Sequence, residues 1–341
     1  MDRTSMTGLE RTRRCLAGGP VDRLPVLPIL HSGLAPLAGV PLGRFLTDAD
    51  AMAGVLLDGY RRFGYDGIQF SLGVTAEAEA LGARVTQPED GAPILTEHLV
   101  ADWANLPRLA EREPERAGRF PLFADAIARV MDAVGAEAFI LPTLRGPLLM
   151  ASQLRGVEPL LMDMLDTPEQ IDRLLSFTTD VALRLGRWLR RTGAHGLVLG
   201  EATCSPSFIS PTLYRELVLP HHRRLIADLK AAGWETVGLH ICGATLPIVD
   251  DVISTGADFM DVDYQVPAED ILARTANRMA LRGNLDPSSV LRFGKPADVR
   301  QRTVALLAQV RSSRWIVSSG CDIPPGTPAA NIAALVEACR G

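Results

Sequence analysis

Short apolar segments alternate with longer amphipathic segments along almost the whole chain. The short segments predict buried strands, because they are too short for helices and are bounded by turn-forming residues. We expect eight strands, at residues 24–30, 68–70, 138–141, 196–200, 235–240, 258–263, 279–283 and 315–318. Strands that alternate with helices form a parallel sheet, and eight such units close into a barrel. The sequence therefore predicts an α/β protein with a single (β/α)8 TIM barrel that comprises residues 1–341.

The amphipathic segments predict the helices. We expect them at residues 7–16, 48–63, 122–134, 159–164, 167–192, 210–232, 245–254, 268–275, 295–310 and 327–340. Several of them open with proline at the first helical position, as after Thr167 and Ser210, where its missing N–H costs nothing. Residues 74–99 differ, because turn residues at 88–91 separate two short alternating runs. We expect an inserted β-hairpin there and no second domain.

Charge and composition narrow the possible partners. The net charge is −5, and the arginines are spread among acidic residues. Nucleic acid and anionic membrane surfaces are bound by clustered Lys and Arg, so we expect neither as a partner. We also expect no membrane-spanning helix, because no uninterrupted apolar run reaches the length of about 18 residues that such a helix needs.

The cysteines indicate the compartment. There are five, an odd number, and they lie far apart in a long chain, which does not fit a disulfide framework. Residues 1–5 carry charged side chains and no apolar segment of a secretory signal. We therefore expect a cytoplasmic protein, since a reducing cytoplasm keeps thiols free.

Two cysteines and a histidine at strand ends predict a metal centre. His240 and Cys242 are two positions apart, so in extended chain their side chains point the same way. Cys321 follows the last expected strand, and the carboxyl ends of all barrel strands meet on one face. One nitrogen and two sulfurs suit zinc, and three protein ligands leave a fourth position open for a reactant. The alternative is that both cysteines are small buried hydrophobic residues.

The same residues resemble a known family. His-Ile-Cys-Gly at 240–243 and Ser-Gly-Cys-Asp-Ile-Pro-Pro-Gly-Thr-Pro at 319–328 are similar to zinc methyltransferases of the uroporphyrinogen decarboxylase superfamily, which include methylcobalamin:coenzyme M methyltransferases. The resemblance runs from about Asp22 through the last helix. Gly-Asn-Leu-Asp-Pro at 283–287 is shared with the decarboxylases and identifies only the superfamily. The resemblance implies zinc-dependent transfer of a methyl group from a methylcorrinoid to a thiol or similar acceptor.

The decarboxylases themselves fit less well. They carry an arginine near the first strand, where this chain reads His31-Ser32-Gly33-Leu34, and an aspartate where this chain has Leu72. Those groups bind the carboxylates and pyrrole nitrogens of a porphyrinogen. Decarboxylation of that type is one alternative, and a non-catalytic barrel that binds a tetrapyrrole or corrinoid is another.

Further residues are expected around the metal centre. Glu201 is a candidate for a displaceable fourth zinc ligand or a simple rim carboxylate, and Asp263 for a group that holds a zinc-ligand histidine or the acceptor, or that caps a helix. Asn284 is a candidate positioning donor. His31 is a candidate to contact substrate or corrinoid, or is an incidental histidine of the rim. Arg145 is a candidate to meet an anionic tail on the acceptor, or forms a surface salt bridge.

We further expect a partner protein, and we assign three remaining side chains that could carry chemistry. The chain has no Asp-x-His-x-x-Gly cobalamin motif, so we expect a separate corrinoid carrier protein, with a thiol or tetrahydrofolate as the small-molecule acceptor. His221 and His222 are expected in solvent on a helix away from the strand ends. Cys204 is expected near the rim as an unpartnered thiol.

Overall fold

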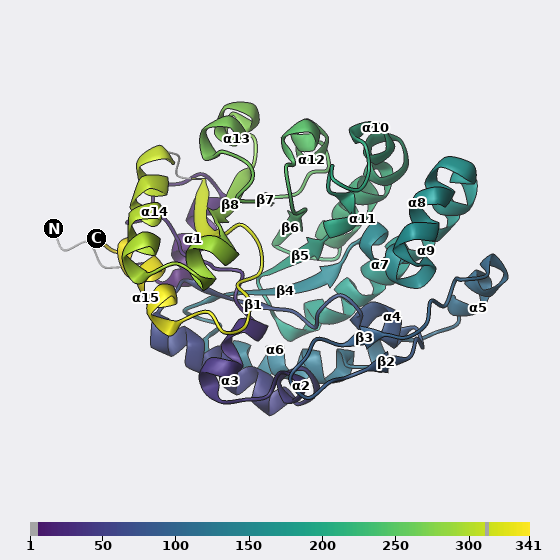
Figure 1. Cartoon of the computed structure of the whole chain (residues 1–341), viewed down its shortest axis with the longest axis horizontal. Helices are drawn as coiled ribbons and strands as arrows, with labels where there is room; N and C mark the ends of the chain where they lie inside the picture. The colour runs from purple at the N-terminus through teal and green to yellow at the C-terminus, as the bar shows by residue number, and fades with distance from the viewer. Residues whose placement is uncertain (1–5, 311–313) are drawn as a thin grey trace.

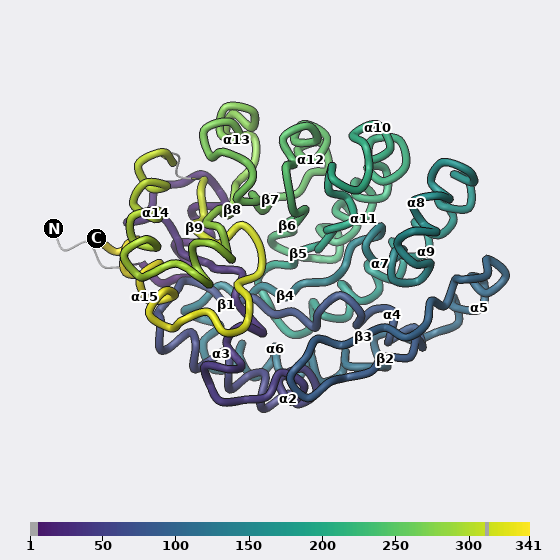
Figure 2. The backbone as a smooth tube through the Cα atoms, in the orientation of Figure 1, coloured from purple at the N-terminus to yellow at the C-terminus, as the bar shows by residue number. Residues whose placement is uncertain are grey.

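The computed structural model describes residues 6–310 and 314–341, so the charged residues 1–5 lie outside it. Seven parallel strands form one curved sheet, and the backbone passes them in chain order from β4 to β9, with β1 beside β4 (Figure 2). The strands are β1 (Gly67–Phe70), β4 (Phe139–Arg145), β5 (Gly196–Gly200), β6 (Thr236–His240), β7 (Phe259–Val262), β8 (Ala280–Leu285) and β9 (Trp315–Ser319). The predicted α/β class and parallel sheet are confirmed.

Helices surround the sheet on its outer side, except α1 (Gly8–Leu16), which packs against the apolar residues inside the sheet (Figure 1). The others are α2 (Leu42–Thr47), α3 (Ala49–Phe63), α4 (Ala76–Ala80), α5 (Leu106–Leu109), α6 (Phe120–Val134), α7 (Pro147–Arg155), α8 (Val157–Asp166), α9 (Pro168–Leu189), α10 (Pro211–Leu213), α11 (Leu219–Ala231), α12 (Val249–Ile253), α13 (Ala268–Thr275), α14 (Pro296–Gln309) and α15 (Ala329–Ala338). The expected helix at 210–232 is divided by a π-helical turn, Tyr214–Val218. Within the described residues, every helix is too short or too polar to cross a membrane.

The prediction of eight strands is wrong at residues 24–30. This segment lies extended between β9 and β1, but it forms a single parallel bridge, between Val26 and Val317. On its other side, the N–H of Asp66 donates to the carbonyl oxygen of Val26 (2.7 Å). Pro25 and Pro28 have no N–H to donate, and proline does not continue the ladder of a central strand. The barrel-like sheet therefore has seven strands and a proline-rich segment at its seam.

The predicted insertion at residues 74–99 is confirmed as a hairpin. It contains α4 and the short antiparallel strands β2 (Val85–Thr86) and β3 (Ile94–Leu95), which form a sheet of their own. The hairpin extends beside α2 and α4 (Figure 1). It leaves the seven-stranded sheet uninterrupted.

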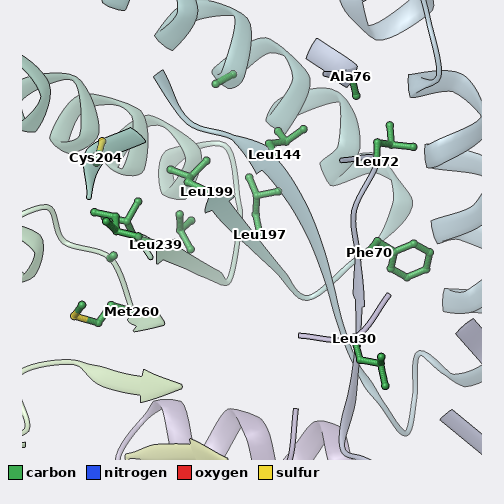
Figure 3. Packing of buried hydrophobic residues seen from close by; sticks show 14 of the residues in the cluster. Leu30, Phe70, Leu72, Ala76, Leu144, Leu197, Leu199, Cys204, Leu239 and Met260 are labelled. Carbon is green, nitrogen blue, oxygen red and sulfur yellow. The ribbon is translucent and has the colours of Figure 1, made fainter. Parts of the chain in front are cut away.

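Side-chain alternation along the strands separates two apolar layers. Outward residues such as Leu144, Leu199 and Leu239 belong to the core between sheet and helices, part of which is drawn in Figure 3. Inward residues form a second cluster inside the sheet, which includes Phe139, Val198, Phe259 and Ile316. This inner cluster fills the lower part of the barrel, so a site for chemistry remains only above it, at the carboxyl ends of the strands.

Candidate active site

Three potential ligand atoms converge where β6 and β9 end. His240 is the last residue of β6, Cys242 follows two positions later, and Cys321 lies two positions after β9. Nε2 of His240 is 3.0 Å from Sγ of Cys242 and 3.7 Å from Sγ of Cys321, and the two sulfurs are 3.5 Å apart. The three residues predicted to bind metal are thus brought together from segments about 80 positions apart in sequence.

The donor set fits zinc in chemistry and in spacing. Zinc bonds of about 2.3 Å to sulfur and about 2.0 Å to nitrogen place tetrahedral ligands roughly 3.5–3.8 Å apart. The two separations that involve Cys321 lie within that range, and the 3.0 Å between His240 and Cys242 is about 0.5 Å shorter. A hydrogen bond from the Cys321 thiol outweighs burial and, with the neighbouring His240, lowers the pKa of Cys242 to about 5. One thiolate is therefore favoured even before a metal binds, while its hydrogen bond to Cys242 and burial raise the pKa of Cys321.

A buried polar chain below the cluster orients His240. The Asp261 carboxylate accepts a hydrogen bond from Nδ1 of His240 (2.7 Å), which leaves Nε2 directed at the sulfurs. Arg282 donates to both oxygens of Asp261 (2.7 Å each) and through Nη1 to Oε1 of Gln69 (2.7 Å). Burial alone would lower the pKa of His240, but the Cys242 thiolate and Asp261 hold it well above its usual value.

Sequence reasoning missed this chain and assigned the supporting role to Asp263. The signal was present, because Asp261 and Asp263 are two positions apart and share one face of the strand. Asp263 instead accepts hydrogen bonds from the backbone N–H groups of Gly243 and Gln265 (2.9 Å each). It holds the loop that carries Cys242. Asn284 likewise donates to the carbonyl oxygen of Val266 (2.7 Å), so a catalytic role for Asp263 or Asn284 stays a prediction.

Glu201 lies in the wall of the site and is fully buried. Its oxygens accept hydrogen bonds from the N–H groups of Leu148 (3.0 Å) and Leu149 (2.7 Å) in the first turn of α7. His222 contacts the same carboxylate through Nε2 (2.8 Å) and Tyr214 through Nδ1 (3.0 Å). These contacts occupy the carboxylate, so its role as a displaceable zinc ligand stays a prediction.

The expectation for the two adjacent histidines was wrong. His222 is fully buried, and His221 is nearly so and pairs with Asp172 (3.0 Å). Both histidines lie on the face of α11 that packs inward. Their position after Pro220 in the sequence did not indicate this burial. Cys204 is buried beside Glu201 and His222, and with them it forms a second group of potential ligand atoms. Burial and the Glu201 carboxylate raise the pKa of the Cys204 thiol well above its usual value, which does not favour a thiolate there.

A cavity of about 160 Å³ opens above the three ligand residues. Its walls combine apolar side chains with a few polar ones, among which are His31, Arg145 and Asp322. His31 and Arg145 were expected to contact bound reactants, and both line this cavity. Asp322, directly after Cys321, was not singled out from the sequence, although its position beside a metal-capable cysteine was visible.

Comparisons with known proteins identify the family. The sequence matches the uroporphyrinogen decarboxylase (URO-D) family over residues 7–341, so the chain belongs to that family. A methylated-thiol–coenzyme M methyltransferase of Methanosarcina mazei is 28% identical, with 99% of this chain and 90% of that protein aligned. The methylcobamide:CoM methyltransferase MtbA of Methanosarcina acetivorans is 26% identical, with 99% and 98% aligned. A uroporphyrinogen decarboxylase of Prochlorococcus marinus is 22% identical, with 82% and 79% aligned.

Solved structures show the same fold. A methyltransferase from Methanosarcina mazei superimposes with a TM-score of 0.91 at 22% identity and covers 98% of this chain and 99% of its own. A B12-independent methionine synthase from Shewanella gives a TM-score of 0.58 at 12% identity over 86% and 87% of the two chains. The chain is thus an enzyme of the URO-D superfamily, and the resemblance to its methyltransferase branch is confirmed.

Proposed function

We propose that this protein is a zinc-dependent methyltransferase that moves a methyl group from a methylcorrinoid to a small thiol. The observation that carries the proposal is the cluster of His240, Cys242 and Cys321 at the base of a solvent-connected cavity. The relatives named as coenzyme M methyltransferases align along almost the full chain, which supports the same reaction class. Leu72, buried where the decarboxylases have an aspartate, disfavours the alternative.

The roles of the residues follow from their contacts. His240, Cys242 and Cys321 would hold the ion, and Asp261 would keep the imidazole in the orientation that presents Nε2. When bound, zinc lowers the pKa of a coordinating thiol, which is about 8.5 when free, so that the thiolate predominates at neutral pH. The cavity walls orient the acceptor. Such orientation can lower the activation free energy by about 7 kcal/mol or more.

Bonds, protons and electrons balance in the proposed methyl transfer. The acceptor thiol gives its proton to solvent, and its sulfur attacks the methyl carbon of the methylcorrinoid. The new S–C bond forms as the Co–C bond breaks, and the electron pair of that bond stays on cobalt. The products are a methyl thioether and the demethylated corrinoid.

We further propose that the methylcorrinoid arrives on a carrier protein. Large apolar side chains are exposed on the segments after four strands: Val74 after β1, Phe208 after β5, Tyr264 after β7 and Phe293 after β8. All four strands end at the face where the cavity opens. Exposed apolar side chains on the segments of one face favour a protein contact there, and a carrier docked on this face would bring its methyl group to the cavity.

A spectroscopic assay tests the proposal. The purified protein is loaded with zinc and mixed with free methylcobalamin and a panel of thiols, and the cobalt spectrum is followed. We expect about one zinc per chain and thiol-dependent demethylation, and both fall to background in His240→Ala and Cys321→Ser. Cys339→Ser, a buried cysteine at the end of α15, is the control and should keep both. A metal-free protein with full activity, or no demethylation with any thiol, would overturn the proposal.

A further inference from the structure

Two opposite charges face the cavity that receives the acceptor. Arg145 is the last residue of β4, and Asp322 follows Cys321. Both line the same cavity as His240, Cys242 and Cys321. Within the described part of the chain, no ion pair joins Arg145 to Asp322. The two charges are therefore presented to whatever occupies the cavity, and they do not neutralise each other by contact.

The Arg145 guanidinium is fixed at one end and open at the other. Nε donates to the carbonyl oxygen of Gly73 (3.1 Å), and Nη2 donates to Oγ of Ser71 (2.6 Å). Nη1 lies against Gly200, where an added Cβ would be only 2.7 Å away. Gly200 pairs with His240 across β5 and β6, so the open end of the guanidinium lies on the cavity side near the metal-capable cluster. This end is free to bind a carboxylate.

The Asp322 carboxylate is fixed in the same way. His31 accepts a hydrogen bond at Nδ1 from the backbone N–H of Ser32 (2.8 Å), so its proton is on Nε2, which donates to Oδ1 of Asp322 (2.9 Å). This hydrogen bond positions the carboxylate at the edge of the cavity. The Asp322 side chain is 60% exposed, and among the described residues Oδ2 has no hydrogen-bond donor. That oxygen is available for an ammonium group.

We propose that the methyl acceptor is a small zwitterionic thiol whose carboxylate binds Arg145 and whose ammonium group binds Asp322. The inference rests on the proposed function and specifies its substrate. A cavity of about 160 Å³ has room for a small thiol of amino-acid size. An acceptor with only negative charge would meet the Asp322 carboxylate as a repulsive neighbour.

Matched acceptors test the two charges separately. Homocysteine carries both groups, a mercaptobutyrate lacks the ammonium, a mercaptopropylamine lacks the carboxylate, and mercaptoethanesulfonate is a purely anionic thiol. With free methylcobalamin as donor, we expect kcat/KM for homocysteine to exceed that of each analogue by about 10–100-fold, the range for one lost charged hydrogen bond.

Two variants should each remove one preference. Asp322→Asn should reduce the ratio of homocysteine to the mercaptobutyrate by about tenfold or more and leave its ratio to the mercaptopropylamine unchanged. Arg145→Gln should do the reverse. Ratios within one variant cancel any loss of folded enzyme, and Asp132→Asn and Arg302→Gln, both at exposed positions, are the matched controls.

Binding provides a readout without turnover. Methionine, the methylated product, should bind in calorimetry more tightly than the methylthiobutyrate that lacks its amino group, and Asp322→Asn should remove this difference. If mercaptoethanesulfonate is the preferred acceptor and Asp322→Asn leaves the ranking unchanged, the inference fails while the proposed methyltransferase function stands. If no thiol is methylated, the proposed function fails and the inference fails with it.

Discussion

His240 is held by a carboxylate that is itself held by a guanidinium, and both supporting groups, Asp261 and Arg282, are fully buried. A buried ion pair gives little net stability, because both charges lose their hydration. The Asp261–Arg282 pair therefore has its main effect on orientation, since it fixes the imidazole tautomer that presents Nε2. The strand alternation that identified His240 and Cys242 also placed Asp261 inward, one strand further along.

Replacing Asp261 should weaken metal binding and also lower stability, because the buried Arg282 loses its charged partner. In Asp261→Asn the amide oxygen still accepts from Nδ1 of His240, but the negative charge is lost. We expect zinc affinity to fall by about 10–100-fold, the usual effect of altering a group behind a ligand histidine. Competition with a chromophoric chelator measures this, and circular dichroism checks the fold. Asp270→Asn, exposed on α13, should bind zinc as the unaltered protein does. Equal affinity in a folded Asp261→Asn would contradict the assigned role.

His195 should make stability depend on pH. Its Nδ1 accepts a hydrogen bond from the N–H of Ile140 (3.0 Å), and burial lowers its pKa from 6.5 to about 4. Between those two pH values the unfolded chain binds more protons than the folded one, so the free energy of unfolding decreases as the pH falls through this range. His195→Asn keeps an acceptor for Ile140 and removes the titration. Urea unfolding at several pH values should show a shallower decrease for the variant, and parallel curves would refute this account.

At the scale of elements, the start of α7 depends on a side chain from the end of β5. Proline begins the helix without an N–H, and the next two N–H groups donate to the Glu201 carboxylate. The positive end of the helix dipole favours a negative charge there. Gly146 permits this approach, because a Cβ on it would lie about 2.4 Å from the carboxylate oxygen. His222 then connects the same carboxylate to α11.

Glu201→Gln should therefore act on stability. The amide NH2 group cannot accept from the α7 backbone, so one buried donor loses its partner, and we expect the free energy of unfolding to fall by about 1–3 kcal/mol. Denaturant unfolding measures this, with the exposed Glu111→Gln as the control. If the variant keeps its stability but loses zinc affinity, Glu201 is a metal ligand, as the sequence had first indicated, and the anchoring role is wrong.

At the scale of the whole molecule, the sequence predicted what strand parity and barrel topology determine. Parity placed His240 and Cys242 on one side, and topology brought Cys321 to the same end of the sheet. The sequence did not reveal that residues 24–30 form only one β-bridge, because an apolar segment with two prolines resembles a buried strand until its neighbours are known. The burial of His222 was equally hidden, since its partner Glu201 is 21 positions away and on another element.

A buried aspartate closes the seam of the sheet beside residues 24–30. Residues 24–30 contribute few backbone hydrogen bonds there, and Asp66, just before β1, compensates with its side chain. This buried carboxylate pairs with Arg11 and Arg23 and accepts from the N–H of Val26 (2.7 Å). It lies at the opposite end of the sheet from His240. Asp66→Asn should therefore lower the free energy of unfolding by about 1–3 kcal/mol, because Arg23 and the Val26 N–H lose a charged acceptor while Arg11 keeps its pair with Asp22, and kcat/KM of the protein that remains folded should stay the same. Urea unfolding and the methyl-transfer assay measure the two quantities, and Asp90→Asn, exposed in the hairpin, is the control. A loss below about 1 kcal/mol, as for a surface ion pair, would show that the seam closes without Asp66.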